Sequence, residues 1–500
     1  MNRRELMLRL AAAGHAPFLL FPSAARAAGA DDWQAPFDAS SAPWKAGFAT
    51  PQGDLPLTAA QVRGRFPDAV AGTFYRQGPA GHDLGGERNH HWFDGDGMVQ
   101  AFVIRPGEVH HQGRFVRTAK RAAEQQAGRR LTDGFGTVFD NTAPVNAPDD
   151  MNVANINLLA VGNELLALWE GGSATRLDPL TLETLGRKVW RPDLAGAPFS
   201  AHPRTDPDGT VWNFGVSSNT GLLVLYEIAP DGVLRRADAL AVADMPMLHD
   251  FAVTANHLVF LLPPLVYDPK RKAAGASFLD AHVWRPALGL RALVIHKRDW
   301  KKQQWLTLPA GFLFHLGNAW EEQTAVGTVI HVSHVQTPDA APVMVDTREV
   351  MRGRPGSGSR PRLTVAMLNL ASGRAKQAIL PTDAEFPRID PRLTGLRNRH
   401  VFHAAQQLQG LPLFNAIART DVESGASQRF GFGPWALVEE HVYVPDGDGP
   451  GWLLGTVFDS LRRCTVLNCF AADALGDGPV AQASLPYALP LGFHGVFVAA

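Results

Sequence analysis

The chain has 500 residues, with 47 basic and 48 acidic side chains and a formal net charge of −1. This balance excludes the broad basic field of a nucleic-acid-binding protein, and the length is sufficient for a large buried core. Beyond the N-terminal region, no stretch of the sequence is long and apolar enough to span a bilayer.

The N-terminus has the features of an export signal. Twin arginines, Arg3 and Arg4, precede an apolar region, and Ala25-Arg26-Ala27 fits a small-x-small cleavage site. We predict a signal peptide over residues 1–27, of twin-arginine type rather than with an ordinary basic n-region, and export to the periplasm. Residues 28–500 contain no long linker and are predicted to form a single domain.

The mature chain alternates short apolar runs with turns, at Asp208-Gly209, Asp231-Gly232 and Asp446-Gly447 among others. Helical periodicity is scarce, and Thr118–Arg130 is the best candidate for a helix. Many short strands over this length predict an all-β protein, either a β-propeller or a sandwich, and the length favours the propeller. The clearest predicted strands are 165–169, 210–214, 222–226, 258–262 and 328–332.

The run Asp94-Gly95-Asp96-Gly97 predicts a tight hairpin turn. Calcium binding is the alternative, but an EF-hand loop needs alternating oxygen ligands and a distal glutamate, which this run lacks. Cys464 and Cys469 have an odd spacing that places them on opposite faces of a strand. They lack the spacing of a zinc site, so we predict core packing, and an exported protein would also permit a disulfide.

Four histidines lie in apolar or tight sequence contexts: His202, His249, His315 and His494. They are too far apart for a local metal motif such as HExxH. Each one alone is compatible with an ordinary core histidine. Neutral imidazoles at the ends of strands could also meet at the axis of a propeller.

Several blocks of the chain, in order, resemble the carotenoid cleavage oxygenase family, which includes apocarotenoid oxygenases and lignostilbene dioxygenases. The similarity spans nearly the whole mature chain. The blocks are Gly72-Thr73-Phe74-Tyr75-Arg76-Gln77-Gly78-Pro79, Phe93-Asp94-Gly95-Asp96-Gly97-Met98-Val99, Ala201-His202-Pro203, Met247-Leu248-His249-Asp250-Phe251, Phe314-His315-Leu316-Gly317-Asn318-Ala319 and Gly492-Phe493-His494-Gly495.

The resemblance implies a seven-bladed β-propeller with one Fe(II) per chain on its axis, held by the four histidines. Such a metal has no charged ligand, so carboxylates are expected behind the imidazoles. By resemblance these are Glu170, Glu385 and Glu440, which would pair with His249, His315 and His494 respectively and leave His202 without a carboxylate.

The same resemblance implies that O2 reacts beside the double bond of a lipophilic polyene, in an apolar tunnel. We predict Trp169, Phe314 and Phe493 as tunnel walls, although ordinary core packing would also explain them. Ile156 lies where relatives often have threonine, near the open metal position. Isoleucine offers no hydrogen bond there, which predicts a drier and more hindered site.

The predicted activity is oxidative cleavage of a carotenoid or apocarotenoid C=C bond to two carbonyl products. Stilbene cleavage is the alternative, but stilbene-cleaving members carry a lysine where this chain has Trp169 and a tyrosine near the position of Val138. An indole cannot stabilise a phenolate as an ammonium can. A pigment-binding propeller without turnover is the non-enzymatic alternative.

The segment 261–267 is apolar and is followed by the cations Lys270, Arg271 and Lys272. It is interpreted either as a peripheral membrane contact that collects lipophilic substrate or as a plain loop. The sequence carries no signal for an oligomeric state.

Overall fold

The computed structural model describes residues 33–500 except 141 and 359. The predicted export signal, residues 1–27, lies outside these residues, so the signal and the periplasmic location stay predictions. Within the described part of the chain, none of the helices combines the length and apolar character needed to cross a membrane.

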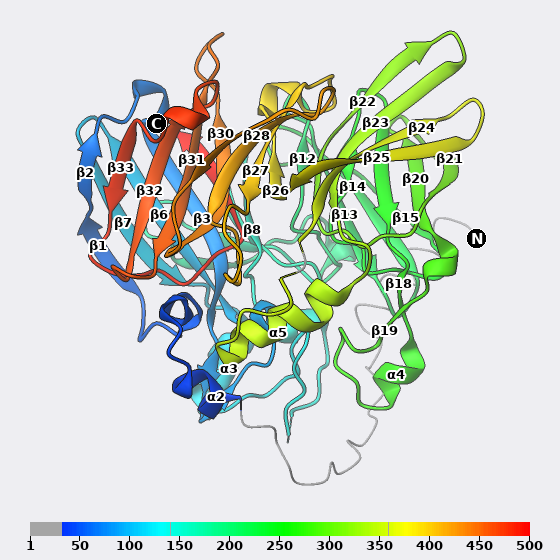
Figure 1. Cartoon of the computed structure of the whole chain (residues 1–500). Helices are drawn as coiled ribbons and strands as arrows, with labels where there is room; N and C mark the ends of the chain where they lie inside the picture. The colour runs from blue at the N-terminus through cyan, green and yellow to red at the C-terminus, as the bar shows by residue number, and fades with distance from the viewer. Residues whose placement is uncertain (1–32, 141, 359) are drawn as a thin grey trace.

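The described residues form a seven-bladed β-propeller, which confirms the predicted fold (Figure 1). Blades one to three, each from the axis outward, are β34 (His494–Ala499), β3 (Gly72–Gly81), β6 (Asp96–Arg105), β7 (Glu108–Phe115) and β1 (Leu55–Ala59); β8 (Asn157–Val161), β9 (Glu164–Leu168), β10 (Thr175–Leu177) and β11 (Thr184–Arg187); and β12 (Arg204–Thr205), β13 (Val211–Ser217), β14 (Leu222–Ile228) and β15 (Leu234–Ala241).

Blades four to seven follow the same plan, with strands later in the sequence lying farther from the axis, except that the early strand β2 lies outermost in blade seven. They are β16 (Ala252–Val253), β17 (His257–Leu262), β20 (Leu290–His296) and β21 (Asp299–Leu308); β22 (Leu316–Thr324), β23 (Gly327–Gln336), β24 (Arg362–Asn369) and β25 (Arg374–Asp383); β26 (Glu385–Arg388), β27 (His400–Ala405), β28 (Ala416–Asp421) and β29 (Ser427–Gly431); and β30 (Ala436–Val444), β31 (Trp452–Asp459), β32 (Cys464–Ala471), β33 (Ala481–Ser484) and β2 (Gln61–Gly64).

The two ends of the described chain close the ring, because the C-terminal end adds a strand to the first blade and the N-terminal end adds a strand to the last blade. The last strand, β34, pairs antiparallel with β3 from His494 opposite Gln77 to Ala499 opposite Gly72, and becomes the innermost strand of blade one. The early strand β2 pairs with β33 at the outer edge of blade seven. The C-terminal segment is therefore part of the fold rather than a free tail.

The blades pack face to face, so their strands are buried on both sides. In β14, Leu222 and Val224 point toward blade two, whereas Leu223 and Leu225 point toward Phe260 of blade four. This alternation explains why the sequence shows continuous apolar runs rather than an apolar–polar pattern.

The α-helices of the described residues lie at one end of the propeller (Figure 1). The predicted helix at Thr118–Arg130 is confirmed as α3, which begins after its N-cap Thr118 and ends before Gly128, whose φ is 65°. The helices are α2 (Gln34–Ala39), α3 (Ala119–Ala127), α4 (Pro269–Ala273) and α5 (Thr347–Glu349), and two small sheets join β4 (Asp83–Leu84) to β5 (Glu87–Arg88) and β18 (Leu265–Tyr267) to β19 (His282–Trp284).

The predicted hairpin turn at Asp94–Gly97 is wrong, because Asp96 and Gly97 begin the buried strand β6. The two carboxylates bond to other segments: Asp94 accepts hydrogen bonds from residues 136 and 137, and Asp96 pairs with Lys120 of α3. Gly97 is needed for close approach, since a Cβ there would lie 2.0 Å from the carbonyl oxygen of Ala154.

Two further predictions are decided by burial. Cys464 and Cys469 are free and buried in β32, which agrees with core packing, and burial raises the pKa of Cys469 to about 12. The segment 261–267 is not a plain loop, because its apolar side chains are buried in β17, in β18 and in the turn between them. Peripheral membrane contact, which the exposed cations Lys270 and Arg271 would have to make, stays a prediction.

Candidate metal centre

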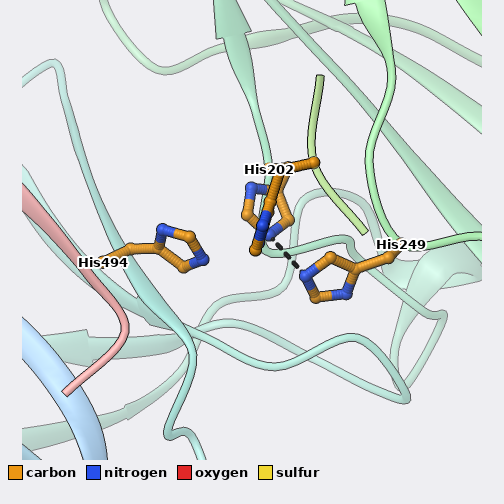
Figure 2. A group of neighbouring side chains, drawn as sticks. His202, His249 and His494 are labelled. Atoms are coloured by element: carbon orange, nitrogen blue, oxygen red, sulfur yellow. Dashed lines mark hydrogen bonds between the residues drawn. The ribbon is translucent and has the colours of Figure 1, made fainter. Parts of the chain in front are cut away.

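Four histidines converge at the propeller axis because each stands at or just before the start of an innermost strand. His202 precedes β12, His249 precedes β16, His315 directly precedes β22 and His494 begins β34. Strand starts of neighbouring blades meet at the same end of the axis. Figure 2 shows the rings of His202, His249 and His494 pointing toward a common centre.

The rings are close enough to share one ion. One nitrogen from each of the four histidines lies within 4.8 Å of the others, a grouping found in the described residues. The Nε2 atoms of His202 and His249 are 2.9 Å apart (Figure 2). His315 Nε2 is buried without a hydrogen-bond partner among the described residues, which leaves its lone pair or proton facing the cluster.

Three carboxylates lie behind three of the rings. His315 Nδ1 donates to Glu385 Oε2 and His494 Nδ1 donates to Glu440 Oε1, each at 2.9 Å. His249 Nδ1 lies against Glu170 Oε1. A carboxylate can only accept, so the Nδ1 atoms of His315 and His494 carry the proton and their Nε2 atoms are free to bind a metal.

Burial and neighbouring charges keep the cluster in a form that can bind a cation. Burial lowers the pKa of His202 well below its ordinary value, and it lowers the pKa of His494 to about 4. Burial also acts on His315, but Glu385 outweighs it and raises the pKa of that imidazole. A more basic imidazole is a stronger ligand, so Glu385 favours metal binding at His315.

Glu440 is held as a carboxylate by its own partners. Burial alone would raise its pKa, but Arg388 and His494 hold it well below its ordinary value. Arg388 donates from Nε and Nη2 to the two oxygens of Glu440, at 2.8 and 2.7 Å. Glu440 also accepts from the backbone N–H of Gly495 at 2.9 Å, so it orients both the ring and the backbone of the His494 segment.

The cluster opens into a cavity of about 1810 Å³ that lies between the axis and the loops at the helical end. All four residues predicted near the substrate line this cavity, and the carboxylates Glu170 and Glu385 reach it as well. His249, His315 and His494 contribute to its wall. The four residues predicted near the substrate are Ile156, Trp169, Phe314 and Phe493.

The chain matches the family model described as "Retinal pigment epithelial membrane protein" over residues 48–499. It is 31% identical to the apocarotenoid-15,15'-oxygenase of Synechocystis sp. over 90% of this chain and 95% of that protein. The chain belongs to the carotenoid cleavage oxygenase family.

One further member of the family and one solved structure bear on the site. The resveratrol cleavage oxygenase 1 of Aspergillus fumigatus is 29% identical, over 91% of this chain and 95% of that protein. The crystal structure of the cobalt-substituted apocarotenoid oxygenase of Synechocystis superposes with a TM-score of 0.83 at 27% identity, and the match covers 92% of this chain and 98% of that one. The family thus includes a structure with a transition metal bound.

The residues of this carotenoid cleavage oxygenase chain fit such a metal. Four imidazoles suit iron, cobalt, nickel, copper or zinc, and three of the four are oriented by a carboxylate as metal-ligating histidines usually are. The buried, unpartnered Nε2 of His315 is the observation that decides the fit, because such an atom is costly unless something binds it.

Some residues of the site were not predicted. Phe386 follows Glu385 with a positive φ of 53°, and its ring centroid lies 5.5 Å from that of His315 and 5.4 Å from that of His494. Phe93 stacks edge-on against both Phe314 and Phe493, at 5.8 and 5.2 Å. Phe93 stands in a block that carried the family resemblance, so its sequence position could have indicated a role at the site. Nothing in the sequence indicated the positive φ of Phe386.

Proposed function

We propose that this protein is an Fe(II)-dependent dioxygenase, with one iron per chain, that cleaves a C=C bond of a carotenoid or apocarotenoid to two carbonyl products. The single observation that carries the proposal is the opening of a four-imidazole cluster into a large aromatic cavity. Relatives named for cleaving carotenoids support the reaction class.

His202, His249, His315 and His494 would hold the metal through Nε2. When bound, iron supplies the one-electron chemistry that O2 requires. Glu385 and Glu440 keep Nδ1 of His315 and His494 protonated and fix their ring planes, and Glu170 lies against the ring of His249, so the ligand set would need little rearrangement when the metal arrives.

The cavity would bind and orient the polyene. Phe314 contacts the His249 ring with a centroid distance of 4.9 Å, and Phe93 connects Phe314 to Phe493. An unbroken aromatic wall therefore runs beside the cluster. Apolar walls exclude water and place one double bond beside the histidines, which is the main contribution that the protein can make to a reaction of this kind.

Ile156 completes the dry surroundings of the proposed open position. It lies just before β8, the innermost strand of blade two, and its backbone N–H donates to Leu168 at 3.2 Å. Its half-buried side chain lines the cavity and carries no hydrogen-bonding group. A ligand at this position would therefore receive no hydrogen bond from the side chain of residue 156.

The proposal is tested by anaerobic reconstitution of the purified protein with Fe(II), followed by incubation with an apocarotenal under O2. We expect one iron per chain and release of a shorter aldehyde. Matched samples use His249→Ala, which should bind less iron and lose turnover. A wild-type protein that binds the polyene but holds no stoichiometric iron, or that turns over neither polyenes nor stilbenes, contradicts the proposal.

Cleavage of a stilbene is the second candidate, because a resveratrol-cleaving relative matches the chain over nearly its full length. The side chains at the cavity favour the polyene. Trp169 and Val138 both line the cavity, and neither carries a positive charge that could form an ion pair with a phenolate.

The variant Trp169→Lys should move the preference toward 4-hydroxystilbenes. A charge-assisted hydrogen bond contributes about 1.5–3 kcal/mol, so the ratio of kcat/KM for the hydroxystilbene to that for the polyene should rise roughly 10- to 100-fold. Trp169→Phe is the control, since it removes the indole without adding a cation, and it should leave the ratio within a few-fold. A ratio that rises equally in both variants would show that size, rather than charge, sets the preference.

A further inference from the structure

A buried ion pair lies directly behind three of the four histidines. It joins Arg204 to Asp250, with Nη2 2.8 Å from Oδ1 and 2.6 Å from Oδ2. The Asp250 side chain is 1% exposed and that of Arg204 is 18% exposed. Asp250 directly follows His249, and Arg204 comes two residues after His202, so the pair sits where two ligand-bearing segments cross.

The Arg204 side chain reaches the backbone at the start of β16 in blade four and of β22 in blade five. Its Nε donates to the carbonyl oxygen of Phe251 at 2.8 Å, and its Nη2 donates to that of Leu316 at 2.7 Å. Its Nη1 donates to Gly317 at 3.3 Å. One guanidinium in blade three thus binds the backbones that follow His249 in blade four and His315 in blade five.

Asp250 makes the complementary contacts. Its Oδ2 accepts the backbone N–H of Leu316 at 2.7 Å, and its Oδ1 accepts that of Phe251 at 2.7 Å. Leu316 is thereby held at both its N–H and its C=O, one residue beyond His315. The pair therefore connects the backbone of three segments, at Arg204, Phe251 and Leu316, each within two residues of a histidine.

We propose that Arg204 and Asp250 are positioning residues that set the distances between His202, His249 and His315, and so tune the affinity and geometry of the metal site. This inference rests on the proposed function, since it assumes that the histidines hold a metal. Neither side chain is proposed to touch the metal or the substrate.

The physical reason is that side-chain orientation alone does not place these ligands. A carboxylate behind a ring fixes the ring plane but not the separation of the backbones that carry the rings. His202 also has no glutamate partner of the kind that the other three have, and its backbone N–H is held by Ser200 Oγ at 3.1 Å. A fork-shaped guanidinium with five donors can fix several backbones at once, which a lysine cannot.

The chain offers a matched control in the ion pair between Asp206 and Lys297. This pair also links blades three and four, with Nζ 2.8 and 2.6 Å from the two oxygens, and Asp206 accepts a further hydrogen bond from Trp212 Nε1. Its bonds go to residues outside the histidine segments. Substituting Asp206 therefore weakens the same blade contact without touching the strand starts that carry ligands.

The test compares full-length wild type, Asp250→Asn, Arg204→Lys and Asp206→Asn, each stripped of metal and titrated with Co(II) against a competing chelator. The visible absorption bands of bound Co(II) report the coordination geometry, and thermal unfolding of the metal-free proteins reports stability. We expect Asp250→Asn and Arg204→Lys to lose about 10- to 100-fold in Co(II) affinity and to shift the bands. Asp206→Asn should keep affinity within about two-fold of wild type and an unchanged spectrum.

The outcomes separate this inference from the proposed function. Wild type that binds Co(II), together with Asp250→Asn and Arg204→Lys that keep its affinity and spectrum, overturns the positioning role alone. Equal loss of affinity in Asp206→Asn also overturns it, because general weakening of the blade contact would then suffice. Wild type that binds no Co(II) overturns both the proposed function and this inference. If Asp250→Asn does not fold, Arg204→Lys decides, since it keeps the charge.

Discussion

Deletion of residues 492–500 will abolish iron binding, whereas deletion of Ala499 and Ala500 alone will leave it close to one iron per chain. The longer deletion removes His494 and all of β34, the innermost strand of blade one. The shorter one removes the last backbone pair with β3, at Gly72, and the hydrogen bond from the Ala500 N–H to the carbonyl oxygen of Ala71. The measurement is iron content per chain after anaerobic loading and gel filtration.

The longer deletion also opens the ring of blades, so a point variant is needed to separate ligand loss from unfolding. His494→Ala keeps the strand pairing of β34 and removes only the imidazole. It should lose iron to a similar extent while keeping the far-UV circular dichroism of wild type. Stoichiometric iron in either His494→Ala or the 492–500 deletion would show that His494 is not a ligand.

The variant Glu439→Gln should lower the free energy of unfolding by about 3–5 kcal/mol, because it leaves the buried Arg76 guanidinium without a counter-charge. The pair is deeply buried, with both side chains 3% exposed and Nη2 2.6 Å from Oε1. Chemical denaturation of the metal-free protein measures the effect. The double variant Arg76→Met/Glu439→Gln should recover part of the loss, since no unpaired charge then remains.

This ion pair also holds the segment that leads to His494. Arg76 donates to the carbonyl oxygen of Pro490, and Glu439 accepts from the backbone N–H of Gly492 and from Thr456 Oγ1. A Cβ at position 492 would lie 2.8 Å from Arg76 Nε, so the glycine allows this close approach. If the single and double variants are equally destabilised, the cost comes from lost packing and not from the unpaired charge.

The adjacent residues Glu439 and Glu440 lie at an irregularity in the pairing of β30 with β31, and they have different partners. The register between β30 and β31 shifts between Val438 and His441, and both carboxylates are buried at this irregularity. Glu439 binds Arg76 and the backbone before His494, and Glu440 binds the ring of His494. Both residues therefore hold the same histidine segment from adjacent positions.

Much of this protein follows from its sequence alone. The frequent turns between many short apolar runs, over a chain of this length, predict a propeller, and the apolar or tight settings of the four histidines mark them among eighteen. The matching blocks then identify the family and the three glutamates. These features are local, because strand propensity, turn chemistry and motif residues are visible within a few positions of the chain.

Only the tertiary structure decided which of these local features come into contact with one another. His202 and His249 are 47 residues apart in the chain, yet their Nε2 atoms lie 2.9 Å from each other because their blades are neighbours around the axis. The Asp94–Gly97 run has the composition of a turn but begins a buried strand, since its carboxylates find partners near residue 136 and in α3. The ion pair of Arg204 and Asp250 joins three blades by hydrogen bonds to backbone atoms. Such bonds have no sequence signature, because every residue has the same backbone groups. Ring closure by β34 and β2 sets all of these distances at once, and long-range packing of this kind leaves no trace in local composition.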